Sequence, residues 1–122
     1  MSLKERLKKA VASQAEIEAS EEREEAHRSV GCTPVDQLSN RSRASVSGVI
    51  RSVTLRPREG VPALEAELYD GSGSLSVVWL GRRQIAGIEP GRRVRVHGLV
   101  TTSDGQPAIY NPRYELVPRG HA

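Results

Sequence analysis

The residues in this chain that are best suited to chemistry are its arginines, and the chemistry they suit is anion binding. No lysine follows Lys9, and residues 31–122 hold twelve arginines against eight acidic residues, which gives this region a net charge of +4. A guanidinium group is planar and presents five N–H donors, so it pairs bidentately with phosphates and carboxylates. A general preference for arginine in the genome is the other explanation of the missing lysines, and the sequence leaves both open.

Four aromatic side chains accompany the arginines, and a nucleic-acid base stacked on such a ring gains about 1–3 kcal/mol. They are Tyr69, Trp79, Tyr110 and Tyr114. Tyr69 alternates with Leu68 and therefore faces away from the core. Trp79 shares its parity with Leu75 and Val77, so it either packs in the core or stacks on a ligand. The last two tyrosines either stack or cover an edge of the sheet.

The remaining reactive residues form no catalytic or metal-binding set. His27, His97 and His121 are scattered and have no carboxylate or cysteine at the spacing of metal ligands. Cys32 is the only cysteine, which excludes an intramolecular disulfide and is typical of a reducing compartment. The chain has no G-x-S-x-G motif and no Ser/His/Asp set. We therefore expect no enzymatic activity, no metal and no cofactor.

No stretch of the sequence indicates export or membrane insertion. The charged N-terminus is not followed by the apolar run of a secretory signal. No apolar segment approaches the ~18 residues that predict a transmembrane helix. We expect a soluble, cytoplasmic protein with no membrane partner.

The strands are organised around a hairpin over residues 64–81. Apolar and polar residues alternate from Leu64 to Tyr69, which is the period of a strand with one buried face. The glycines of the segment DGSG (residues 70–73) supply the positive φ angles of a tight turn. No helix follows this segment, so it is a turn rather than a phosphate-binding loop. The next residues, to Leu80, are rich in β-branched types and form the return strand.

The first strand spans Arg43–Arg56 and precedes the hairpin. Its apolar residues change parity after Ile50, and Val53 begins the new set. A change of parity within one strand requires a bulge or a sharp bend, and Gly48 lies close enough to permit it. Such a strand is able to join both halves of a closed barrel.

Two more strands follow the hairpin. One covers residues 92–100 (RRVRVHGLV), and the last covers residues 108–117, where Pro112 predicts an edge or a bulge. We expect a short helical turn between the third and fourth strands. Within it, Ile85 and Ile88 are predicted to plug one end of the barrel.

The first 30 residues differ from the rest in composition. Residues 3–29 contain no proline or glycine and have a weak apolar stripe, which predicts a marginal helix. This helix is either solvated and frayed, or it docks a protein partner or touches nucleic acid through its basic residues Lys4, Arg6, Lys8 and Lys9. We divide the chain into a charged N-terminal helix (1–30), a linker or short turn onto the barrel (31–42), the barrel (43–117) and a tail (118–122).

Five strands, a bent first strand and no repeated βα unit predict an all-β core with an α appendage. This pattern matches the five-stranded Greek-key barrel of the oligonucleotide-binding (OB) fold, here preceded by the charged helix.

Three blocks, DGSGSLSVVWLG, PGRRVRVHGLV and IYNPRYEL, carry a resemblance to a known family. Over residues 43–117 the chain resembles the OB wedge domain of RecG-type branch-migrating helicases and, more loosely, anticodon-binding and single-strand-binding modules. The resemblance implies binding to single-stranded or branched nucleic acid, DNA or RNA, with an aromatic ring stacked on a base. The chain has no G-x-x-x-x-G-K-[ST] phosphate loop, so we expect a stand-alone module without a helicase motor.

In OB folds the ligand groove lies over the second and third strands, between the loops that join strands one and two and strands four and five. The candidate nucleic-acid-binding residues are Arg56, Arg58, Tyr69, Trp79, Arg82, Arg83, Arg93, Arg95, Tyr110 and Arg113. The arginines of strand four have a second interpretation, in which they pair with Glu65 or Glu67 of a neighbouring strand and add only solubility. The rival hypothesis is a protein-interaction module that uses the barrel groove or the N-terminal helix.

Overall fold

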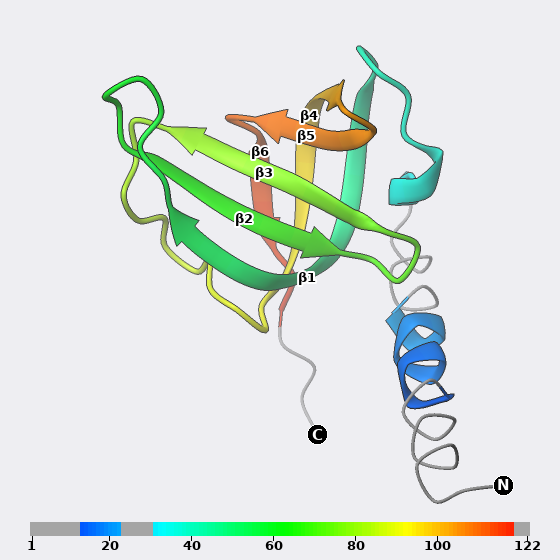
Figure 1. Cartoon of the computed structure of the whole chain (residues 1–122). Coiled ribbons are helices and arrows are strands. Elements are labelled where there is room, and N and C mark those ends of the chain that lie inside the picture. The colour runs from blue at the N-terminus through cyan, green and yellow to red at the C-terminus, as the bar shows by residue number, and fades with distance from the viewer. Residues whose placement is uncertain (1–12, 23–30, 119–122) are drawn as a thin grey trace, which may run out of the picture.

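The strands close into a barrel, and among the described residues a helix and a 3₁₀ turn precede them (Figure 1). The computed structural model describes residues 13–22 and 31–118. The elements, in chain order, are a helix over residues 13–22, η1 (Val35–Gln37), β1 (Arg43–Leu55), β2 (Ala63–Tyr69), β3 (Ser74–Leu80), β4 (Arg93–Ser103), β5 (Gln106–Tyr110) and β6 (Arg113–Leu116). The strand order is β1-β2-β3-β5-β4-β6, and an additional pairing of β1 with β4 closes the ring.

The predicted hairpin is formed by β2 and β3, which pair antiparallel along their whole length. Gly71 adopts a φ of 88° in the turn between them. The carboxylate of Asp70, which is 2% exposed, accepts hydrogen bonds from the backbone N–H groups of Ser72 and Gly73 at 2.9 and 3.1 Å. The turn therefore depends on a buried carboxylate as well as on Gly71, the one of its two glycines that has a positive φ.

β1 bends so that its first half pairs with β4 and its second half with β2, and Val49 belongs to both pairings. At this crossing a Cβ on Gly48 would lie 2.5 Å from the carbonyl oxygen of Tyr69, so only glycine fits. The predicted bulge is present, but the extra residue is Arg51, three positions after Gly48. Gly48 therefore allows β1 to approach β2 closely at Tyr69, whereas the bulge at Arg51 produces the change of parity.

The last predicted strand is divided into β5 and β6 by a bulge. β5 pairs in parallel with β3 and antiparallel with β4, whereas β6 pairs with β4 alone. The register along β4 shifts by one residue between the two segments, and Asn111 adopts a left-handed φ of 50° just before Pro112. The predicted interruption at Pro112 is therefore confirmed. With β5 and β6 taken as one strand, the ring has the five strands predicted.

The interior is filled by aliphatic side chains and Trp79, in a chain that has no phenylalanine. The largest fully buried side chains of the core cluster are Val46, Ile50, Leu68, Leu75, Val77, Val94, Val96, Val100 and Ile109. Ile85 and Ile88 belong to the same cluster and are 5% and 7% exposed, so both pack against the core. That they plug one end of the barrel stays a prediction. The helical turn predicted around them is wrong. Gly87 and Gly91 adopt left-handed φ angles of 81° and 87°, and these angles interrupt a helix.

Residues 31–42 form a short turn onto the barrel, one of the two alternatives that the sequence left open. Val35 of η1 is 6% exposed and belongs to the core cluster. Its N–H donates to Oδ2 of Asp70 at 2.8 Å. Thr33 N–H donates to the carbonyl oxygen of Ser45 at 2.8 Å, which ties the segment to β1. The division of the chain into domains stays a prediction.

The predicted N-terminal helix is helical over residues 13–22. The other parts of the predicted helix, including the basic residues from Lys4 to Lys9, lie outside the described residues, as does the tail 119–122. No helix within the described ranges has the length and apolar character needed to cross a membrane.

Candidate nucleic-acid interface

The outer surface of β2, β3 and β5 is a continuous face on the side where OB folds bind their ligands. Strand alternation points the residues of one parity outward, and we call seven of these residues the groove face: Glu65, Glu67, Tyr69, Ser74, Ser76, Val78 and Tyr110. Val78 pairs with both Glu65 and Tyr110 and has no exposed surface, although it points outward. The side chains around it therefore shield the middle of this face from water.

Arg58 bridges two residues of the groove face. Its Nη1 donates to the hydroxyl oxygen of Tyr110 at 3.3 Å, and its Nη2 donates to Oε2 of Glu65 at 3.1 Å. Its guanidinium carbon lies 5.7 Å from the centroid of the Tyr110 ring. The side chains of Arg58 and Glu65 are 42% and 21% exposed, so this ion pair contributes no more than about 1 kcal/mol. A phosphate is therefore able to compete with Glu65 for Arg58.

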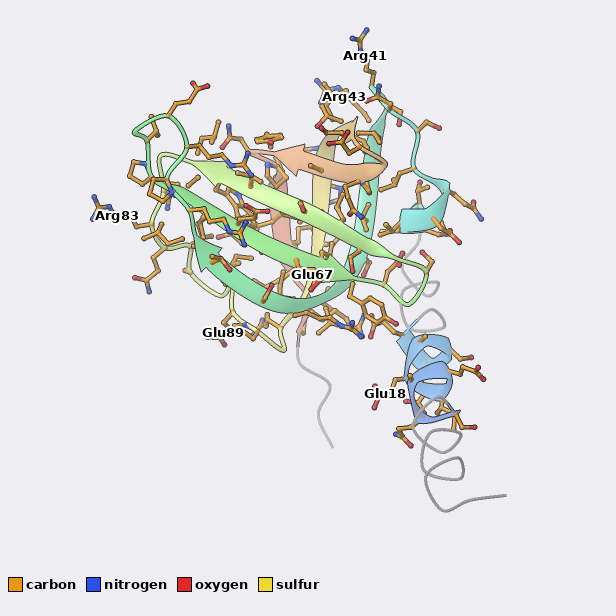
Figure 2. All side chains as sticks on the ribbon, in the orientation of Figure 1. Glu18, Arg41, Arg43, Glu67, Arg83 and Glu89 are labelled. Atoms are coloured by element: carbon orange, nitrogen blue, oxygen red, sulfur yellow. The ribbon has the colours of Figure 1, made fainter. Side chains whose placement is uncertain are left out.

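Four predicted arginines lie in two adjoining loops beside the groove face. They are Arg56 and Arg58 in the loop after β1, and Arg82 and Arg83 in the loop after β3. The loops adjoin because Gly81 N–H donates to the carbonyl oxygen of Pro62 at 2.7 Å. All four side chains are exposed, and Figure 2 shows Arg83 projecting away from the strands. The ion pairs among the described residues involve Arg58 but not the other three.

Tyr69 lies at the far end of β2 and is covered on one side of its ring by Arg51. The guanidinium carbon of Arg51 is 3.4 Å from the ring centroid, a cation–π contact. Tyr69 pairs with Ser74 and Tyr110 pairs with Val78, so the tyrosines lie on opposite sides of β3 and are offset along it by four residues, about 13 Å. Arg51 was not predicted as a site residue, because a change of parity predicts a bulge without identifying the bulged residue.

Trp79 is a core residue. It is 5% exposed and points inward with Leu75 and Val77. Its ring meets that of Tyr114 edge to face, with centroids 5.8 Å apart and planes at 80°. The core interpretation of Trp79 is therefore correct, and its prediction as a stacking residue fails because the ring is enclosed. Tyr114 covers the edge of the barrel, where its hydroxyl donates to the carbonyl oxygen of Ala86 at 3.4 Å.

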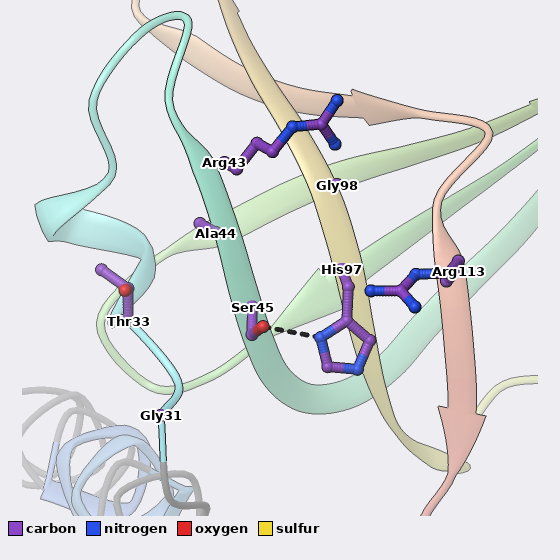
Figure 3. Close-up of a pocket in the computed structure, with 8 residues that line it drawn as sticks. All are labelled: Gly31, Thr33, Arg43, Ala44, Ser45, His97, Gly98 and Arg113. Atoms are coloured by element: carbon purple, nitrogen blue, oxygen red, sulfur yellow. Dashed lines mark hydrogen bonds between the residues drawn. The ribbon is translucent and has the colours of Figure 1, made fainter.

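Arg95 and Arg113 lie on the outer surface of β4 and β6, which the topology separates from the groove face. β4 pairs with β1, β5 and β6 but not with β2. The alternative in which the strand-four arginines pair with Glu65 or Glu67 is therefore wrong. Nε of Arg95 is buried and has no hydrogen-bond partner among the described residues. Arg113 lines a separate pocket that also contains Arg43 (Figure 3).

Three strands bring Ser45, His97 and Glu115 into one hydrogen-bonded chain that the sequence did not reveal. Ser45 Oγ lies 2.6 Å from Nδ1 of His97, and Nε2 of His97 lies 2.8 Å from Oε1 of Glu115. In hydrolases with the G-x-S-x-G motif the nucleophilic serine sits on a sharp turn, whereas Ser45 lies within a regular strand. We therefore interpret these two hydrogen bonds as contacts that hold the His97 ring in place.

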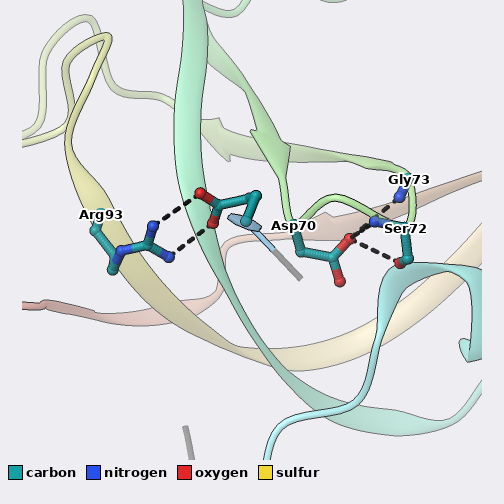
Figure 4. Close-up of polar contacts among 5 residues, drawn as sticks. Asp70, Ser72, Gly73 and Arg93 are labelled. Atoms are coloured by element: carbon teal, nitrogen blue, oxygen red, sulfur yellow. Dashed lines mark hydrogen bonds and ion pairs between the residues drawn. The ribbon is translucent and has the colours of Figure 1, made fainter. Parts of the chain in front are cut away.

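Arg93 is held by the N-terminal helix. Its Nη1 and Nη2 donate to the two carboxylate oxygens of Glu22 at 2.7 and 2.8 Å (Figure 4). The side chains of Arg93 and Glu22 are only 24% and 13% exposed. Glu18 and Glu21 of the same helix line a hollow of about 430 Å³ that Tyr69 and Arg93 also line. The helix therefore neutralises Arg93 and places negative charge beside Tyr69.

Two further features of the described residues bear on reactivity: the placement of metal-ligating side chains and the state of the Cys32 thiol. Within the described ranges, no three His, Cys, Asp or Glu side chains are grouped so that they could hold a metal ion. Burial raises the pKa of the Cys32 thiol above its ordinary value of 9.0, and this effect outweighs the lowering by the nearby Arg95. The thiol is therefore protonated at neutral pH and is a weak nucleophile.

One family's sequence model, described as "OB-fold nucleic acid binding domain", matches residues 44–117. The chain belongs to this family. The match extends from β1 past the end of β6, and the predicted fold class is confirmed. A search of curated protein sequences gives no match.

Solved structures share this OB fold at low sequence identity. The chain is similar to the p204 HINb domain, with a TM-score of 0.59 and 15% identity over 74% of this chain and 49% of that one. It is also similar to RecG in a structure bound to a three-way DNA junction, with a TM-score of 0.56 and 24% identity over 72% of this chain and 12% of that one. The chain thus spans about half of the first protein and a small part of the second. The resemblance to RecG is confirmed at the level of the fold.

Proposed function

We propose that this OB-fold protein binds single-stranded or branched DNA across its groove face and has no catalytic activity of its own. The observation that carries the proposal is an exposed tyrosine on that face held by a loop arginine. Tyr110 is 42% exposed, and Arg58 contacts both its hydroxyl and its ring. Single-strand-binding proteins combine such rings with basic loops that follow the backbone. The fold neighbour RecG, in a structure with a DNA junction, supports DNA as the partner.

The arginines of the two adjoining loops supply the phosphate contacts in this proposal. Of these loop arginines, Arg58 must first exchange Glu65 for a phosphate, whereas Arg56, Arg82 and Arg83 lie outside the ion pairs of the described residues and supply three contacts directly. Three phosphate contacts on a single strand give a slope of about −2 for log K against log salt. The affinity should therefore depend on salt, but less steeply than that of a protein with many phosphate contacts.

The acidic residues of the groove face orient the strand. Glu65 and Glu67 repel phosphates, so the backbone is kept near the arginine loops and the bases turn toward the sheet. A carboxylate there accepts a hydrogen bond from an exocyclic amino group such as N4 of cytosine. Tyr110 stacks on one base, and Tyr69, about 13 Å along the same face, is placed for another.

Charge removal in the loops tests the proposal. The variant R82Q/R83Q should weaken binding of a labelled single strand and reduce the salt slope from about −2 to about −0.7, because two of three contacts are lost. R41Q is the control, since Arg41 is exposed and lies away from both loops (Figure 2). Fluorescence anisotropy measures both quantities, and parallel titrations with RNA of the same sequence compare the two nucleic acids. An unchanged slope in R82Q/R83Q would contradict the proposed path of the backbone.

A further inference from the structure

A pocket of about 290 Å³ opens on the outer surface of β1, β4 and β6 (Figure 3). Arg43 of β1 and Arg113 of β6 line it, together with His97 and Gly98 of the strand between them. The register explains this meeting of distant residues, because β4 pairs with β1 on one side and β6 on the other. We call it the β4 pocket.

The β4 pocket is positively charged. Figure 3 shows the guanidinium groups of Arg43 and Arg113 reaching over β4 from the strands on either side of it. Among the described residues, no acidic side chain lines the pocket and neither arginine takes part in an ion pair. Two guanidinium groups that line one pocket offer several N–H donors to an anion, and planar donor pairs of this kind suit phosphate.

The histidine in the pocket wall is fixed on both of its ring nitrogens. Nδ1 of His97 meets the Ser45 hydroxyl at 2.6 Å, and Nε2 meets the Glu115 carboxylate at 2.8 Å. If Nε2–H donates to Glu115, then Nδ1 accepts from the Ser45 hydroxyl, and both contacts are satisfied by one tautomer. The pairing also directs the Glu115 carboxylate toward the histidine.

We infer that the β4 pocket binds a phosphate group, and that this phosphate belongs to a second arm of a branched DNA. The inference rests on the proposed function for the first arm, which occupies the groove face. The volume is about ten times the ~30 Å³ that one water molecule occupies in the liquid, so a phosphodiester fits together with part of a flanking sugar. A molecule with phosphate sites on two separate surfaces of one barrel holds two DNA segments at an angle to each other.

Binding of a three-way junction and of a single strand separates the two surfaces. The variant R43Q/R113Q should weaken junction binding by about tenfold or more, because a hydrogen bond to a charged group is worth at least that factor. Single-strand binding should change much less. R41Q should leave both affinities within about twofold. Equal losses for the junction and the single strand, or no loss for either, would overturn the inference.

A second measurement distinguishes the sources of the phosphate. Inorganic phosphate added to the ¹⁵N-labelled protein should shift the amide signals of His97 and Gly98, and R43Q/R113Q should abolish these shifts. If phosphate shifts these signals in the unmodified protein but R43Q/R113Q binds the junction with unchanged affinity, the pocket does not hold a second DNA arm. That result would assign the pocket to a free phosphate compound. Loss of junction binding in R43Q/R113Q, with no single-strand binding by the unmodified protein, would refute the groove face and retain the pocket. R43K/R113K retains the charge and should show a smaller loss, because lysine lacks the bidentate geometry.

Discussion

Replacing Tyr110 tests the part of the groove face where the described contacts are most specific. The ring is 42% exposed, so most of the stabilisation lost in Tyr110→Leu should come from the complex with DNA rather than from the folded protein. Loss of one base stack costs about 1–3 kcal/mol, which corresponds to a single-strand affinity about 5- to 150-fold lower. Tyr110→Phe keeps the ring and removes only the 3.3 Å hydrogen bond from Arg58, so its affinity should stay within about threefold.

The assay is anisotropy of a labelled single strand, with Trp79 emission as the check that the core is intact, because that ring is buried. Tyr114→Leu is the matched control, since Tyr114 packs edge to face on Trp79. It should lower the free energy of unfolding and leave the affinity nearly unchanged. Wild-type affinity in Tyr110→Leu would refute the stacking argument. Equal losses in Tyr110→Leu and Tyr110→Phe would show that the hydroxyl group, rather than the ring, makes the contact.

Three further changes have defined outcomes. Glu22→Gln removes the bidentate pair with Arg93, so DNA affinity measured by anisotropy should rise at low salt and the gain should disappear at high salt; a salt-independent gain would contradict the electrostatic argument. Gly48→Ala brings a Cβ within 2.5 Å of the Tyr69 carbonyl oxygen and should cost about 1–3 kcal/mol of stability in urea denaturation; full stability would show that the two strands separate easily. The Cys32 thiol, with its pKa raised above 9.0 by burial, should react with iodoacetamide more slowly in the folded than in the unfolded chain at pH 8. Folding favours the protonated thiol, so Cys32 contributes to the free energy of unfolding below pH 9.0. This contribution is lost as the pH rises through the raised pKa of the folded protein.

Much of the barrel was predictable because its signals are local. The hairpin follows from alternation and from a DGSG turn, and these act over a few residues. The interruption at Pro112 follows from the missing N–H of proline. The position of the bulge was harder to predict. Gly48 lies near the change of parity, but it is needed for the close approach of β1 to Tyr69, and the bulged residue is Arg51.

The candidate site was less predictable because its contacts join residues that are distant in sequence. The alternation of its strand places Trp79 in the core, whereas its aromatic ring suits stacking on a base. The closed barrel decides between the two, because it buries the ring. The bond from Arg58 to Tyr110 spans 52 residues, and the ion pair of Arg93 with Glu22 spans 71. The β4 pocket requires Arg43 and Arg113 to meet over a strand that lies between them in the sheet. No periodicity within one strand contains that information.

The measurement that tests the central claim most directly is a titration of a labelled single-stranded DNA with the unmodified protein at a series of salt concentrations. Groove-face binding through three phosphate contacts predicts a slope of about −2 for log K against log salt. It also predicts little change in Trp79 emission, because that ring packs in the core. No binding at micromolar protein in low salt, or an affinity that does not depend on salt, would contradict the account and favour the protein-interaction hypothesis.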